Sequence, residues 1–93
     1  MLVRFLSPLP ITITSRRGTK CTLSLSIESS SDRRELIMTE EGHCGYRIFH
    51  NFSPHEYGKI DEILRSGIEV RPESLFARCC RAMASEGLVE LTP

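Results

Sequence analysis

The hydrophobic period of the sequence changes near Asn51, and this change constrains the fold more than any other feature. Before it, apolar and polar residues alternate, as in half-buried β-strands. After it, apolar residues recur every three or four positions, as in amphipathic helices. The sequence therefore predicts an α+β fold, an antiparallel β-meander of about four strands packed by two C-terminal helices, with a short final strand. The length suits one domain covering residues 1–93.

Alternating patterns predict several strands in the first half of the chain. The clearest runs from Thr19 to Ile27, and a shorter one runs from Leu9 to Ile13. Between them, Ser15-Arg16-Arg17-Gly18 predicts a hairpin loop in which the glycine takes a left-handed conformation. A strand over Leu2–Leu6 is expected at a sheet edge, because two prolines follow it closely.

Two further strands are expected before the change of period. Residues 35–41 favour a strand, although a short helix that begins at Asp32 is the alternative. Residues 46–50 are rich in aromatic and β-branched side chains, which favour strands. Simple alternation along this strand and the two residues after it places four side chains on one face: Tyr46, Ile48, His50 and Phe52.

The second half predicts two helices joined by an extended segment at Ile68–Val70. Ser53, Pro54 and Glu56 form a helix-start signal with capping-box spacing, and Gly67 ends that helix. The second helix is expected from about Pro72 to Glu86, followed by a short strand at Leu88–Leu91. Its spacing directs five side chains inward: Leu75, Phe76, Cys79, Cys80 and Met83.

Charge points to the β half as the basic side of the protein. Twelve basic and twelve acidic residues cancel over the whole chain, but residues 1–52 carry a net charge of +2. Two predicted loops and the start of a strand hold the cations concerned: Arg16, Arg17, Lys20, Arg33 and Arg34. If the sheet brings these loops together, the cations are expected to bind phosphate or a protein partner with an acidic surface, and the protein partner is favoured.

A nucleic-acid-binding role is the alternative. Residues 75–91, a helix closed by an acidic residue and glycine and followed by an apolar strand, resemble the end of a winged-helix recognition helix. The predicted second helix also has a polar stripe at i, i+3/i+4 spacing, with Arg71, Arg78 and Arg81, as a groove-reading helix presents. The net charge of −2 over residues 53–93 opposes this role, since phosphate binding relies on excess positive charge.

Neither metal binding nor catalysis is expected from the sequence. No C-x-x-C pair occurs, and His50 and His55 fall at a strand end and a helix start. Cys44 lies beside His43 in a predicted loop, but nothing in the sequence holds the pair in the fixed geometry that activates a thiol. We therefore expect no catalytic residues, no cofactor and no metal.

The compartment follows from what the sequence lacks. No apolar stretch reaches the length of a membrane span or a signal-peptide core, so a cytoplasmic protein with free cysteines and no membrane contact is expected. The overall prediction is a small non-enzymatic binding module that regulates, inhibits or tethers a larger protein, in the manner of accessory or mobile-element proteins. A homodimer in which the expected edge strand Leu2–Leu6 and the exposed part of the last strand pair across a two-fold axis stays open.

Overall fold

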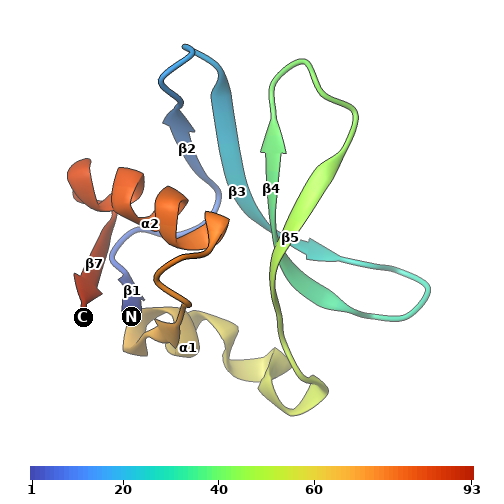
Figure 1. Ribbon diagram of the computed structural model, residues 1–93. Helices are drawn as coiled ribbons and strands as arrows, with labels where there is room; N and C mark the ends of the chain where they lie inside the picture. The colour runs from blue at the N-terminus through green and yellow to red at the C-terminus, as the bar shows by residue number, and fades with distance from the viewer. The chain divides into compact units, whose positions relative to one another are not determined.

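The computed structural model describes residues 1–93 and divides into two compact units. The meander unit consists of residues 9–58, and the terminal unit consists of residues 1–8 and 59–93. Each unit has its own antiparallel sheet (Figure 1). The predicted α+β class is confirmed, as are the four-stranded meander, the two C-terminal helices and the short final strand.

The meander unit contains a sheet with the strand order β2-β3-β4-β5. Its strands are β2 (Ile11–Thr14), β3 (Lys20–Ile27), β4 (Arg34–Glu40) and β5 (Tyr46–Asn51). The strand preference for residues 35–41 is therefore confirmed, and the helical alternative is wrong. One face of the sheet carries the buried apolar side chains Ile11, Ile13, Leu23, Leu36 and Met38.

The opposite face of this sheet is rich in hydroxyl groups. Thr12 pairs with Thr22, and Thr22 pairs with Thr39, so three threonines form a row across β2, β3 and β4. The hydroxyl oxygens of Thr12 and Thr22 lie 3.2 Å apart, which joins the first two members by a hydrogen bond. The alternation read from the sequence therefore assigns the correct faces in β2 and β3.

A β-bulge in β5 makes the expected face of this strand wrong. Ile37 pairs with Ile48 while Leu36 pairs with His50, so β5 has one extra residue, Phe49, at this point. An extra residue reverses the faces of the residues on one side of it. Tyr46 and Ile48 are consequently 58% and 47% exposed, whereas His50 lies on the other face with its ring 4.8 Å from that of the buried Phe52.

The terminal unit contains a three-stranded sheet with the order β6-β1-β7. Its strands are β1 (Leu2–Phe5), β6 (Ile68–Glu69) and β7 (Val89–Thr92). The expectation of an edge strand at Leu2–Leu6 is wrong, because β1 pairs on both sides and is the central strand. The homodimer contact expected at this strand therefore has no free edge there, whereas the last strand, β7, keeps one unpaired edge.

The first C-terminal helix is divided in two. Residues Pro54–Lys59 form the 3₁₀ helix η1, and the α-helix α1 covers only Ile60–Ser66. The predicted capping contact is present, since the backbone N–H of Ser53 donates to the Glu56 carboxylate at 2.8 Å. Lys59 has a non-helical ψ of 27° with a φ of −135°, and this interrupts the helix that the sequence predicts as continuous. Gly67 ends α1 as predicted, with its N–H bonded to the carbonyl of Ile63.

The second helix, α2 (Leu75–Ser85), begins later than predicted. Ser74 is its N-cap, with its hydroxyl accepting from the N–H of Ala77 at 3.1 Å, so Pro72 lies in the preceding turn. Phe76, Cys80 and Met83 are buried as predicted, but Leu75 is 41% exposed and Cys79 only partly buried. Helix α1 contacts β1, and α2 contacts β7. Neither helix has the length and hydrophobicity that a bilayer span requires.

Candidate functional site

The hairpin between β2 and β3 presents a well-ordered basic tip, which we define as Arg16, Arg17 and Lys20. The backbone N–H of Ser15 donates to the carbonyl of Thr19 at 2.8 Å, and that of Gly18 donates to the carbonyl of Ser15 at 2.9 Å. The Ser15 hydroxyl also accepts from the N–H of Thr19 at 3.2 Å. Gly18 has a φ of 80°, the left-handed conformation predicted for it. These bonds fix the backbone from which the basic side chains extend.

The three side chains of the basic tip are exposed and have no partner inside the protein. Neither the two guanidinium groups nor the lysine ammonium group forms a hydrogen bond or an ion pair with another part of the chain. All three therefore keep their full donor capacity for an external anion.

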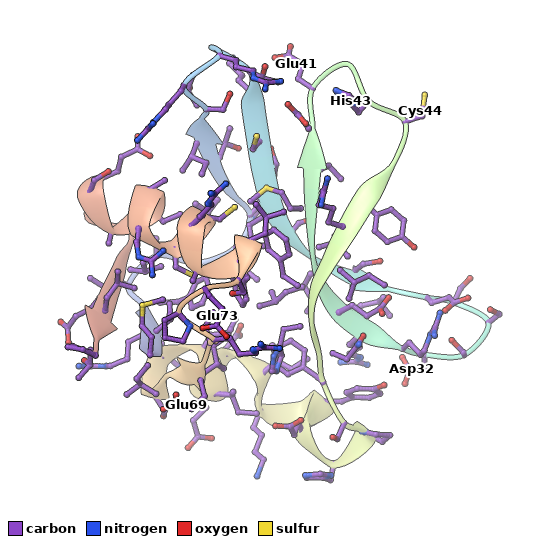
Figure 2. The ribbon with its side chains drawn as sticks, viewed as in Figure 1. Asp32, Glu41, His43, Cys44, Glu69 and Glu73 are labelled. Carbon is purple, nitrogen blue, oxygen red and sulfur yellow. The ribbon has the colours of Figure 1, made fainter.

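The sheet does not bring the two groups of predicted binding residues together. Arg16 and Arg17 lie in the β2–β3 loop, whereas Arg33 and Arg34 lie where the β3–β4 loop joins β4. These loops are at opposite ends of β3, which spans eight residues, about 26 Å of extended chain. Figure 2 shows the same separation, with Asp32 in the β3–β4 loop far from the end of the sheet that holds Glu41.

Arg33 is engaged within its own loop. Its Nε donates to the Glu28 carboxylate at 3.0 Å, and the same carboxylate accepts from the hydroxyls of Ser30 and Ser31. These hydrogen bonds, that of Ser31 first and that of Arg33 next, hold the pKa of Glu28 below its usual value. The Arg33 guanidinium thus serves to close the loop, and this explains its position without an external ligand.

Arg34 is also engaged inside the meander unit. Its guanidinium carbon lies 4.8 Å from the centre of the Tyr57 ring, a cation–π geometry. One terminal nitrogen donates to the carbonyl of Tyr57 at 3.4 Å, and the other lies 3.4 Å from Asp32. Arg34 therefore holds η1 against the beginning of β4.

The three arginines of the alternative nucleic-acid surface are not equivalent. Arg71 donates twice to Glu73, at 3.1 and 2.9 Å, and Arg81 donates to the carbonyl of Pro72 at 2.6 Å. Arg78 lies exposed on α2 with no partner in the chain. The strand that follows α2 is β7, and it pairs with β1, which lies near the start of the sequence. One free arginine is left on this helix face.

The β4–β5 loop lies at the same end of the sheet as the basic tip, and its charge is opposite. The backbone N–H of Glu41 donates to the carbonyl of Lys20 at 2.9 Å, which connects the two regions. Glu40 pairs with Cys21 in the register and lies 3.8 Å from the imidazole of His43. Figure 2 shows Glu41, His43 and Cys44 together in this loop. The end of the sheet thus has a basic corner and an acidic corner.

The thiols and imidazoles do not assemble into a metal-binding centre. All four cysteines are free, and no group of three His, Cys, Asp or Glu side chains is placed to hold a metal ion. Burial, with a smaller effect of Cys79, raises the pKa of Cys80 to about 12, so this thiol stays protonated near neutral pH. Cys44 is exposed, and its nearest histidine in sequence, His43, faces Glu40.

Comparison with protein-family models, with curated proteins and with solved structures finds no match to this chain. Among the basic residues expected to bind a partner, four have side chains without an internal partner, and three of these belong to the basic tip. The basic tip is consequently the candidate site.

Proposed function

We propose that this protein is a small non-enzymatic binding module that attaches to a larger protein through the basic tip. The partner presents an acidic surface to Arg16, Arg17 and Lys20, and its attachment regulates, inhibits or tethers that partner. The four free cysteines are compatible with work in the reducing cytoplasm.

The observation that carries this proposal is that three cations without an internal partner lie together on one hairpin, whereas Arg47 on β5 and Arg78 on α2 are single free cations. Arg33, Arg34, Arg71 and Arg81 all donate to groups of the same chain. The three cations of the basic tip do not, although carboxylates are available in the β4–β5 loop at the same end of the sheet. A charged group left without an internal partner on a backbone held by hydrogen bonds is suited to an external partner.

Arginine is well matched to this role. Its planar guanidinium donates two parallel hydrogen bonds to one carboxylate, and such charge-assisted bonds contribute about 1.5–3 kcal/mol each when they are shielded from water. Because exposed ion pairs contribute far less, two neighbouring arginines need a partner surface that covers them. The proposed ligand is therefore a folded or extended acidic protein segment rather than a single free carboxylate.

Charge reversal at the basic tip tests the proposal. The probe is a peptide of ten glutamates, titrated into isotopically labelled protein at low salt and followed by amide NMR shifts. We expect saturable shifts at residues 14–20 in the unchanged protein. Arg16→Glu together with Arg17→Glu should abolish them, since the two substitutions replace attraction by repulsion.

A matched charge change elsewhere controls for net charge. Lys59→Glu together with Arg65→Glu alters the total charge equally at exposed positions whose side chains have no internal partner. This variant should keep most of the binding to the glutamate peptide. Equal binding by both double variants would contradict the proposed site.

The nucleic-acid alternative is tested in the same way with a random-sequence DNA duplex. Affinity at low salt that decreases steeply with added salt, and that is lost in Arg78→Glu, would favour the alternative. Binding of the duplex that requires Arg16 and Arg17 instead would show that the basic tip recognises phosphates rather than a protein.

A further inference from the structure

We propose that the acidic partner binds as an extended segment that adds a fifth strand to the free edge of β2, with its carboxylates beside the basic tip. This inference rests on the proposed function and specifies how the partner is held. The backbone of β2 would supply the hydrogen bonds, and Arg16 and Arg17 would supply selectivity for acidic sequences.

The direction of the peptide groups in β2 follows from the hairpin. β2 is the edge strand of its sheet and pairs only with β3. The N–H of Ser15 donates to Thr19 and so points toward β3. Peptide groups in an antiparallel strand point to alternate sides from one residue to the next. The N–H and C=O groups of Ile13 therefore also point toward β3, whereas those of Thr12 and Thr14 point away from it.

Contacts between β3 and β4 confirm this assignment. The carbonyl of Lys20, the register partner of Thr14, accepts from the N–H of Glu41 and so faces β4. The carbonyl of Thr22, the partner of Thr12, accepts from the Thr39 hydroxyl at 3.4 Å and faces β4 as well. Thr12 and Thr14 therefore belong to pairs without backbone bonds to β3, and their N–H and C=O groups form the free edge.

The free edge of β2 ends at the basic tip. Thr12 and Thr14 have exposed side chains, and Arg16 and Arg17 follow directly along the chain. An added strand lies about 4.8 Å from β2 and runs parallel or antiparallel to it. In either direction, residues that extend beyond Thr14 come beside the two arginines, which places acidic residues of the partner next to unpaired cations.

The other edge of the sheet is a poorer acceptor for an acidic strand. β5 is interrupted by the bulge at Phe49, which breaks the regular spacing of outward-pointing groups. The loop that leads into β5 begins with Glu41, directly after Glu40, and these two carboxylates would repel an acidic segment. The regular pairing of β2 and the charges beside it thus favour the β2 edge.

The probe for this inference is a capped peptide whose four central residues alternate between threonine and valine. Three glutamates stand at each end of this centre. Its twin has proline in place of both valines, so the charge is equal but backbone pairing is blocked. We expect the first peptide to bind and to slow hydrogen exchange at the amides of Thr12 and Thr14. The proline twin should bind about threefold to tenfold more weakly.

A substitution in the protein tests the same bond from the other side. Thr12→Pro removes an outward N–H and no backbone bond to β3, although it also removes the hydroxyl contact of Thr12 with Thr22. Edge strands accept proline at such positions. This variant should bind the first peptide about threefold to tenfold more weakly than the unchanged protein. Tyr46→Pro is the matched control. Tyr46 begins the other edge strand, and by the same alternation its backbone N–H points away from β4.

The outcomes separate this inference from the proposed function. If both peptides bind equally and Thr12→Pro has no effect, while Arg16→Glu with Arg17→Glu abolishes binding, strand addition is wrong and the basic tip stands. If the charge-reversed variant binds like the unchanged protein, both fail. The exchange measurement on the unchanged protein decides the question even if Thr12→Pro does not fold.

Discussion

At the scale of single residues, helix α2 shows how a helical pattern can be right in general and wrong at its first position. Phe76 is 6% exposed and Leu75 is 41% exposed, although both were expected inward. Leu75 is the first residue of α2, and the sequence alone places the start of the helix too early. Burial therefore depends on where the helix begins, which Ser74 decides by its hydrogen bond to the N–H of Ala77.

This difference predicts unequal costs for two alanine substitutions. Phe76→Ala should lower the free energy of unfolding by about 3–5 kcal/mol, because it leaves a cavity where a buried ring stood. Leu75→Ala should cost less than about 1 kcal/mol, since much of that side chain already meets water. Urea denaturation of both variants measures the two values. Similar midpoints for the two variants would mean that the helix faces are assigned wrongly.

At the scale of elements, the turn and capping residues at the ends of strands and helices determine features that hydrophobic periodicity does not predict. The hairpin tip follows its sequence signal closely, because Gly18 takes the left-handed conformation that such loops need. The helix over residues 54–66 follows its signal less closely, since the capping contact of Ser53 and Glu56 begins a 3₁₀ helix instead of an α-helix. A correct start signal therefore does not determine the type of helix.

The cap of α2 provides a prediction at this scale. Ser74→Ala removes the acceptor of the Ala77 N–H and should destabilise the protein by about 1 kcal/mol. Ser85→Ala is a matched control, because the Ser85 hydroxyl only donates to the carbonyl of Ala82 at an exposed helix end. It should change stability by less than about 0.5 kcal/mol. Thermal unfolding of the two variants compares these values, and an equal loss in both would exclude a capping role for Ser74.

At the scale of the whole molecule, the terminal unit joins residues that are far apart in sequence. Its central strand β1 pairs Val3 with both Ile68 and Leu91. The buried side chain of Val3 has no exposed surface. β1 is thus fixed on both sides by strands that come from the last third of the sequence.

Hydrogen exchange tests this arrangement. The amide of Val3 should exchange at least about a hundredfold more slowly than the amides of Thr12 and Thr14, because a central strand opens only with its whole sheet whereas free edges stay open to water. Exchange followed by NMR in the absence of any peptide measures all three. Equal rates at Val3 and Thr12 would show that β1 is not held as a central strand.

The sequence by itself determines most of the strands and helices and where the hairpin tip lies. Alternation and turn residues are local properties, and they predict β2, β3, β4 and the conformation of Gly18 correctly. The candidate cations could also be listed from the sequence. Their partners could not, since Arg34 meets Tyr57 across 23 positions and the sequence carries no signal for such a contact.

Only the tertiary structure decides which strands are central and which cations are free. β1 becomes central because the short strand β6 pairs with it, and two residues are too few to give a periodic signal. The extra residue at Phe49 reverses a face in β5, since alternation depends on an unbroken register. Opposite ends of β3 keep Arg17 apart from Arg33 for a topological reason, because successive turns of an antiparallel meander must lie at opposite ends of the strand they share.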